Sequence, residues 1–252
     1  MYPVLPFGPI TIPTGPLVAL IAVTIGLEIA GRFGRQLQLS IDDVWNTGLL
    51  WVLVSLIVAR FWNVIQFWPV YIAEPWLMMS LRPSGFVWSA GLMVGLVAAY
   101  LYLWRRALSP LPVTVALTAG AITAAALWTA GAFLTGTLIG LPSEAPWALP
   151  YYGVLRHPVA LYYATALALI VLGGWFMVGK VAPGRLLLLW LLAVGILLLF
   201  VSAYEEGGHL IAGFRVNQLI GFLIALIACW GLAQRPVERK VSTTEAEQAL
   251  TE

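Results

Sequence analysis

The residues best suited to chemistry are an arginine and a histidine that stand directly before a proline, at the start of a long apolar stretch. They are Arg156 and His157, followed by Pro158, with Tyr162 one turn further on. Proline fits the first turn of a helix, where its missing N–H loses no partner. Because the helix dipole is positive at that end, two cationic donors placed there favour a phosphate ligand. We expect Arg156, His157 and Tyr162 to bind a lipid phosphate.

Arg60 is a second candidate ligand for a lipid phosphate. It lies within an apolar stretch that begins at Val44, about 24 Å along a helix at 1.5 Å per residue. A charge at that depth costs at least about 2.5 kcal/mol on membrane-insertion scales, and it usually faces a cavity or a partner. A guanidinium matches phosphate geometry. The structural alternatives are snorkelling to the interface or an ion pair with Glu74, Glu205 or Glu206.

A further polar cluster reads Glu205-Glu206-Gly207-Gly208-His209. Glu205, Glu206 and His209 could form an acid/base group, an ion pair or a weak metal site. A solvated loop at a helix end is the alternative, because no second metal-ligand motif accompanies the cluster. We therefore expect no metal site and no cofactor, and the sequence assigns no catalytic residue. Glu28 and Arg32, four residues apart, are expected to form a structural ion pair.

The elements that position these residues are seven apolar stretches. Each is close to the roughly 20 residues that a helix needs to cross a bilayer core, and 61% of the chain is hydrophobic while only 10% is charged. The predicted fold class is an all-α integral membrane protein with seven transmembrane helices. The expected spans are Gly15–Ala30, Val44–Trp62, Phe86–Trp104, Val113–Ile139, His157–Gly179, Leu186–Tyr204 and Val216–Leu232.

The lysine and arginine residues predict the orientation of these spans. Of 13 basic residues, nine follow the first, third, fifth or seventh span, three lie in the other gaps, and Arg60 lies within a span. Cytoplasmic loops carry the excess of basic residues, so we expect an outer N-terminus and a cytoplasmic C-terminus. Residues 1–233 then form one polytopic membrane domain, and residues 234–252 form a polar cytoplasmic tail. Topology accounts for the basic residues, so no nucleic-acid partner is expected.

One segment outside the spans is rich in aromatic residues, proline and methionine. Trp62–Gly85 is too interrupted to be a further straight span, so we expect a short interfacial or re-entrant piece at the outer face. Within the third span, Gly91 and Gly95 stand four residues apart. This spacing lets helix backbones approach closely in lipid.

Several of these segments resemble the bacterial prolipoprotein diacylglyceryl transferases. The run from His157 to Tyr162 is similar to the family motif His-Pro-x-x-Leu-Tyr-Glu, with Tyr163 in place of Glu. Other similar segments are Gly8–Ile12, Ala59-Arg60, Gly85–Leu92 and Asn217–Leu219. The resemblance implies a seven-span enzyme of the bacterial inner membrane with its N-terminus outside. Such enzymes transfer diacylglyceryl from phosphatidylglycerol to a cysteine of a lipoprotein precursor.

The sequence departs from that family at its polar signature, Gly-Arg-x-Gly-Asn-Phe-x-Asn-Gly-Glu, which aligns with Trp128–Thr137. The signature Arg, its two Asn, its Glu and a further family His correspond to Thr129, Ala132, Thr135, Thr137 and Ser89. The transfer needs cations to hold the phosphate leaving group and a way to generate a thiolate. The replacements remove groups of both kinds.

The predicted function is that of a divergent diacylglyceryl transferase-like membrane protein that binds a phosphatidylglycerol-like lipid at the outer leaflet. The sequence leaves open whether it is an active phospholipid-dependent transferase that modifies a lipoprotein precursor, or a pseudoenzyme. The alternatives are a non-catalytic protein that binds lipid or lipoprotein, and a subunit of a membrane complex. The sequence also leaves open whether the outer-face arginine and histidine residues converge.

The predicted orientation can be tested by cysteine labelling of intact cells. A cysteine placed at Ser143 should react with a membrane-impermeant reagent, because Ser143 is predicted to lie outside. A cysteine placed at Ser242 should be protected in the cytoplasm. The reverse pattern would contradict the orientation.

Overall fold

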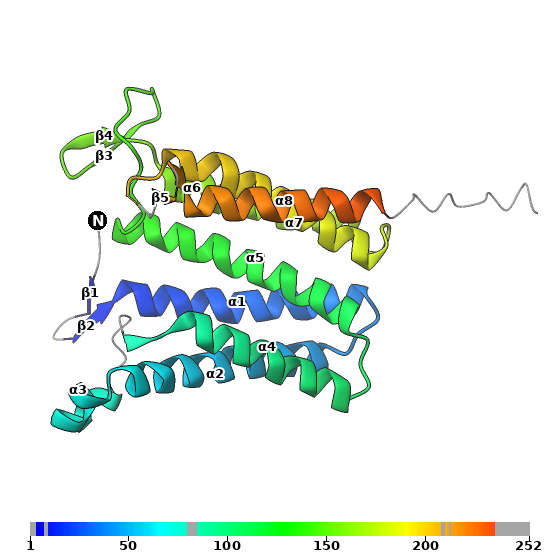
Figure 1. The fold of residues 1–252 in the computed structure, drawn as a ribbon. Coiled ribbons are helices and arrows are strands. Elements are labelled where there is room, and N and C mark those ends of the chain that lie inside the picture. Colours follow the sequence, from blue (N-terminus) through cyan, green and yellow to red (C-terminus); the bar gives the residue numbers. More distant parts are fainter. Residues whose placement is uncertain (1–3, 8–9, 80–84, 208–209, 212, 235–252) are drawn as a thin grey trace, which may run out of the picture.

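In the described residues, seven long helices form a bundle in which they run side by side in alternating directions (Figure 1). The computed structural model describes residues 4–7, 10–79, 85–207, 210–211 and 213–234. The ends of the predicted spans lie within four residues of the ends of these helices, except that α1 continues six residues beyond Ala30. The long helices are α1 (Thr14–Gln36), α2 (Ile41–Gln66), α4 (Trp88–Arg105), α5 (Pro110–Thr135), α6 (Val159–Met177), α7 (Pro183–Val201) and α8 (Val216–Ala233).

Six helices in the described ranges are long and apolar enough to cross a membrane, so the chain is a multi-pass membrane protein. These six are α1, α2, α5, α6, α7 together with its 3-10 extension, and α8. Helix α4, whose 18 residues include Arg105, is not among them. A seventh crossing by α4 and the orientation of the bundle stay predictions.

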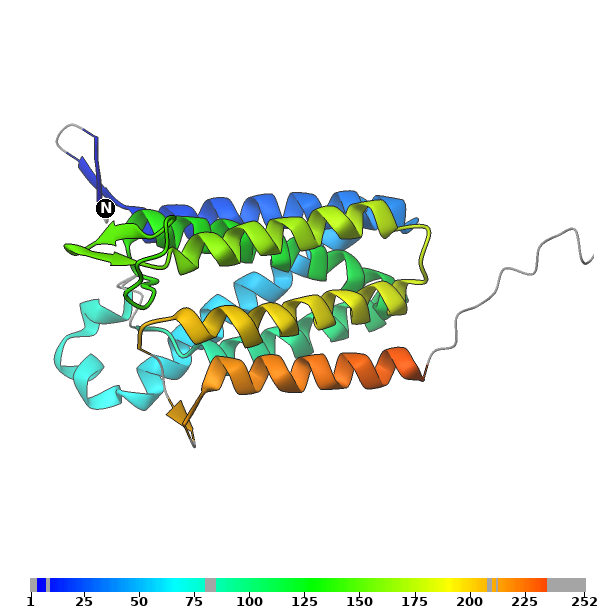
Figure 2. The same ribbon diagram turned by 90° about the horizontal axis from the view of Figure 1, so that it is seen from above.

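All the short elements gather at one end of the bundle, at the left in Figure 1; we call this the hairpin end. Figure 2 shows the same arrangement from above. Where the sequence predicted a short outer piece after the second span, α2 continues to Gln66 and two short helices follow. Three two-stranded antiparallel hairpins were not predicted. The short elements are β1 (Val4–Phe7), β2 (Ile10–Pro13), α3 (Trp68–Ala73), η1 (Pro75–Met79), β3 (Leu149–Tyr151), β4 (Val154–Arg156), η3 (Ser202–Tyr204), β5 (Leu210–Ile211) and β6 (Phe214–Arg215).

Glycines bring the main helix pairs into backbone contact. A Cβ on Gly26 of α1 would lie 2.7 Å from the carbonyl oxygen of Gly120 of α5, and a Cβ on Gly195 of α7 would lie 2.8 Å from that of Gly221 of α8. The predicted close approach at Gly91 is confirmed, because a Cβ there would overlap the Ser55 carbonyl oxygen of α2. Lipid provides no hydrophobic driving force between helices, so such backbone approach is a main source of packing energy.

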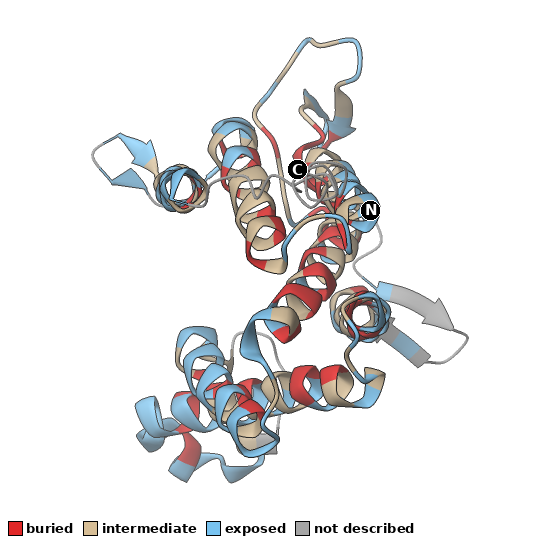
Figure 3. Cartoon of the chain, turned by 90° about the vertical axis from the view of Figure 1, so that its right-hand side faces the viewer, coloured by how far each residue is buried: buried red, intermediate tan, exposed pale blue. Residues whose placement is uncertain are grey.

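The buried core lies where α1, α5, α6 and α7 meet. Phe33 of α1 is fully buried, and its ring packs edge-on against Trp175 at 5.0 Å and Trp190 at 5.5 Å. Figure 3 looks along the helices and shows buried residues in this central group and also on α2, whereas much of α4 is exposed. Helix α4 packs chiefly against α2. The α2–α4 pair is therefore a peripheral unit attached to the core through α1.

Replacing Gly91 by alanine should weaken the α2–α4 contact. Overpacking of a tight contact typically costs about 1–3 kcal/mol, which exceeds the gain of about 0.5–1 kcal/mol that alanine brings to a helix interior. Gly173 of α6 is the matched control, because a Cβ there would meet nothing within 4 Å. We expect the melting temperature in detergent to fall for Gly91→Ala and to stay the same or rise for Gly173→Ala.

Candidate functional site

Three chain segments that are distant in sequence are joined by backbone hydrogen bonds at the hairpin end. The Leu141 N–H donates to the Tyr204 carbonyl (2.8 Å), and the Glu206 N–H donates to the Ile139 carbonyl (2.8 Å). The His157 N–H donates to the Leu141 carbonyl (3.1 Å). The segment after α5, the start of α6 and the segment after α7 are thereby held together. This pairing brings the predicted residues around Arg156 to the predicted carboxylates.

Arg156 forms an ion pair with Glu206. One guanidinium nitrogen, Nη1, donates to the Glu206 carboxylate and, at 3.1 Å, to the Gly140 carbonyl. The Arg156 side chain is only 15% exposed, whereas that of Glu206 is 42% exposed. The Nε atom of Arg156 is buried and has no hydrogen-bond partner among the described residues. Arg156 is thus a largely buried cation whose buried Nε donor is unused.

His157 and Tyr162 lie together, as their spacing in the motif suggests. His157 Nδ1 lies 3.2 Å from the Tyr162 hydroxyl oxygen, which accepts a hydrogen bond from Trp147 Nε1 at 2.7 Å. The hydroxyl proton of Tyr162 is then free to be donated to Nδ1, which favours the tautomer protonated at Nε2. The Tyr204 ring packs edge-on against the imidazole at 4.9 Å. His157 is therefore held in place by aromatic neighbours.

Glu205 is bound by two residues that sequence reasoning did not select as its partners. Tyr163 donates from its hydroxyl to Oε1 of Glu205 (2.6 Å), and Asn217 donates from Nδ2 to Oε2 (3.2 Å). These bonds join the start of α6 and the start of α8 to the segment after α7. The one sequence signal was Tyr163, which stands where the resemblance predicts an acid. We call Arg156, His157, Tyr162, Tyr163, Glu205 and Glu206 the α6 cluster.

The predicted acid/base or metal group of Glu205, Glu206 and His209 stays a prediction. His209 lies outside the described residues. Across the described ranges, no group of three His, Cys, Asp or Glu side chains is placed to hold a metal ion. The expected ion pair of Glu28 and Arg32 is confirmed at 2.9 Å, far along α1 from this cluster.

Arg60 has a different set of contacts from the α6 cluster. Its Nε donates to the Met78 carbonyl (3.2 Å), Nη1 to the Gly85 carbonyl (2.7 Å) and Nη2 to the Leu77 carbonyl. The guanidinium also lies 5.5 Å from the centre of the Tyr71 ring. It forms none of the predicted ion pairs in the described residues, and its partners are backbone carbonyls of η1 and of the chain before α4. The lipid-binding role of Arg60 stays a prediction.

A cavity of about 410 Å³ lies between the start of α1 and the end of α5. It occupies the stretch where the resemblance places the polar signature. The Thr135 hydroxyl bonds to the Gly131 carbonyl at 3.2 Å, and Thr137 pairs with Thr135 at 3.1 Å. The residues that line it include no ionisable side chain; they are Pro13, Gly15, Pro16, Val18, Trp128, Gly131, Ala132, Thr135 and Thr137.

Comparison with known proteins gives the family of the chain. The family model described as prolipoprotein diacylglyceryl transferase matches residues 3–234. The chain belongs to this family. A Clostridioides difficile relative named phosphatidylglycerol–prolipoprotein diacylglyceryl transferase is 24% identical over 197 residues, which are 78% of this chain and 75% of the relative. A relative of the same name from Thermosynechococcus vestitus is 22% identical over 242 residues, which are 90% of each chain.

The positions at which the chain matches the family signature are those that the fold requires. Gly131 lies against Val18 of α1 with no room for a Cβ, and Gly136 ends α5 with a φ of +68°. Phe133 packs edge-on against Tyr151 of β3 at 6.0 Å. Trp128 stands at the first signature glycine, and the four polar or charged signature positions are threonine or alanine here.

Replacing Arg60 by lysine should release the α3–η1 segment. Lysine keeps the charge but lacks the fork of donors that binds three carbonyls at once. A lost charged hydrogen bond costs about 1.5–3 kcal/mol, so amide hydrogen exchange in residues 68–79 should become roughly tenfold faster or more. Arg35→Lys, at an exposed site at the other end of the bundle, is the control and should leave this exchange unchanged. Equal amide exchange in Arg60→Lys and the parent protein would contradict the conclusion that Arg60 holds the α3–η1 segment in place.

Proposed function

We propose that this protein is a divergent family member that binds an anionic phospholipid at the outer leaflet and does not transfer diacylglyceryl groups. The observation that carries the proposal is the cavity between α1 and α5, because none of the described residues that line it has an ionisable side chain. Transfer would require cationic donors for the phosphate leaving group. Removing one such donor typically lowers the rate by about 10²–10³. Several signature groups are replaced here at once.

Lipid binding is assigned to Arg156, His157 and Tyr162. Arg156 has an unused buried donor, and burial strengthens its attraction for an anion. An imidazole protonated at Nε2 offers a further donor toward a phosphate oxygen. The proposed ligand is a phosphate diester of the phosphatidylglycerol kind, because the relatives are named for phosphatidylglycerol. A lipoprotein precursor is the proposed second partner.

The proposed orientation places the hairpin end on the outer face of a bacterial inner membrane, with α4 as the seventh span. The support is the distribution of charge. Arg32, Arg35, Arg105, Arg106, Lys180 and Arg185 all lie at the other end of the bundle, where the positive-inside rule predicts the cytoplasm.

The purified protein should give no diacylglyceryl-peptide when it is incubated with phosphatidylglycerol and a peptide that carries a lipoprotein acceptor cysteine. The reason is that Thr129, Ala132 and Thr137 stand where the resemblance predicts Arg, Asn and Glu. Mass spectrometry of the peptide is the measurement, with an authentic family transferase as the positive control. For the same reason, the gene should not support growth of a transferase-depleted strain. Product formation or complementation would overturn the proposal.

The head-group site can be tested with glycerol 1-phosphate, which has no acyl chain. Glu206→Gln should raise its affinity about two- to fivefold, because the competing carboxylate is half exposed and its pairing with Arg156 is therefore weak. Arg156→Gln should lower the affinity roughly tenfold or more. Arg185→Gln, at the other end of the bundle, is the control. Equal affinity for all four proteins by titration calorimetry would contradict a site at Arg156.

A further inference from the structure

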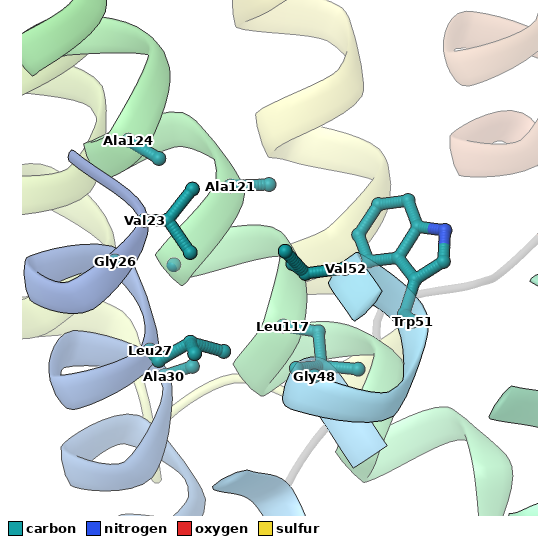
Figure 4. Close-up of a pocket in the computed structure, with 11 residues that line it drawn as sticks. Val23, Gly26, Leu27, Ala30, Gly48, Trp51, Val52, Leu117, Ala121 and Ala124 are labelled. Carbon is teal, nitrogen blue, oxygen red and sulfur yellow. The ribbon is translucent and has the colours of Figure 1, made fainter. Parts of the chain in front are cut away.

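The α2–α4 pair leaves two adjoining apolar crevices where it meets the rest of the bundle. The smaller, of about 210 Å³, lies between α1, α2 and α5. Figure 4 shows Val23 and Leu27 of α1 opposite Val52 of α2 and Leu117 of α5. The larger, of about 430 Å³, lies between α4 and α5 with α2 as its floor. The two crevices share three lining residues, which are Trp51, Leu117 and Ala121. These residues form the boundary between the crevices.

The larger crevice has the size of a ligand site and an apolar lining. Ligand pockets are typically about 300–1,000 Å³. The three threonine hydroxyls in its wall already bond within their own helices: Thr47 to the Asp43 carbonyl (2.6 Å), Thr114 to the Pro110 carbonyl (2.8 Å) and Thr118 to the Thr114 carbonyl (2.7 Å). Because these hydroxyls already donate hydrogen bonds, they need no polar group from a ligand. The crevice suits a hydrocarbon chain.

The length of the larger crevice matches one leaflet of a bilayer. Its lining on α5 runs from Pro110, the first residue of that helix, to Ala121. At 1.5 Å per residue this is about 16 Å, and half of a hydrocarbon core of about 30 Å is about 15 Å. Ala121 and the flanking Leu96 and Tyr100 are exposed, so the crevice is open to surrounding lipid.

Two arginines lie where this crevice ends at the membrane surface. Arg105 closes α4 and Arg106 follows it, in the turn between the two helices that form the crevice walls. Arg106 pairs with Asp43 at 3.1 Å, whereas Arg105 is exposed and makes no ion pair within the described ranges. Arginines near a membrane surface attract anionic lipid, each by about 1 kcal/mol, or roughly fivefold in affinity.

We propose that the α4–α5 crevice is a second lipid site, which binds one acyl chain of an anionic phospholipid with its head group at Arg105 and Arg106. The site lies in the leaflet opposite the hairpin end. This site shares no residue with the α6 cluster. It can therefore be tested independently of the proposed function. A retained lipid here fills the space that the α2–α4 pair leaves open.

The probe is a phosphatidylglycerol with a photoactivatable diazirine in the middle of one acyl chain, supplied in phosphatidylcholine vesicles that contain the full-length protein. Cross-links should concentrate in residues 96–103 and 110–121, and unlabelled phosphatidylglycerol should compete better than phosphatidylcholine. Ala121→Phe should remove this labelling by filling the crevice. Ala168→Phe, on an exposed face of α6, is the matched control and should leave it unchanged. Arg105→Gln and Arg106→Gln should each lower the labelling roughly fivefold.

Three results would overturn the proposal. One is labelling spread evenly over the exposed faces of α6 and α8 as well. Another is labelling of Ala121→Phe equal to that of the parent protein, with melting temperatures that show both to be folded. The third is equal competition by the two unlabelled lipids. None of these results bears on glycerol 1-phosphate binding at Arg156.

Discussion

Backbone contact between helices at glycine residues is the constraint on which the rest of the structure depends. In lipid, apolar side chains gain little by leaving the solvent, so helices associate where their backbones can approach most closely. Gly26 with Gly120 fixes α1 against α5, and Gly195 with Gly221 fixes α7 against α8. The hairpin-end segments emerge from the ends of these paired helices. Their hydrogen bonds form because the helix pairs have already placed them side by side.

Several charged side chains of the hairpin end are bound by other groups of the chain. Glu206 pairs with Arg156, Glu205 takes bonds from Tyr163 and Asn217, and the guanidinium of Arg60 binds carbonyls. Buried charges are costly unless they are paired, so these contacts hold the loops together as well as satisfying the cations. Arg156 differs from Arg60 in keeping an unused buried donor, and this difference makes it the better candidate for a ligand.

The residues that match the family signature have structural roles in this fold. Gly131, Phe133 and Gly136 match the signature, and each has a steric reason in this fold. The cavity beside them is lined by threonine hydroxyls that bond locally and by apolar groups. A helix bundle needs small residues at crossings and an aromatic residue under a hairpin, but it does not need the charges that stabilise a phosphate leaving group.

The sequence by itself determined the helical membrane class, the position of each long helix, the Gly91 contact and the Glu28–Arg32 pair. All of these follow from local rules: the thickness of a bilayer, the spacing of small residues and the pitch of a helix. Only the tertiary structure decided that Glu206 meets Arg156, that Tyr163 meets Glu205, and that Arg60 binds η1. These partners lie 50, 42 and about 17 residues apart. No periodic pattern specifies contacts between loops, because they depend on which helix ends lie side by side.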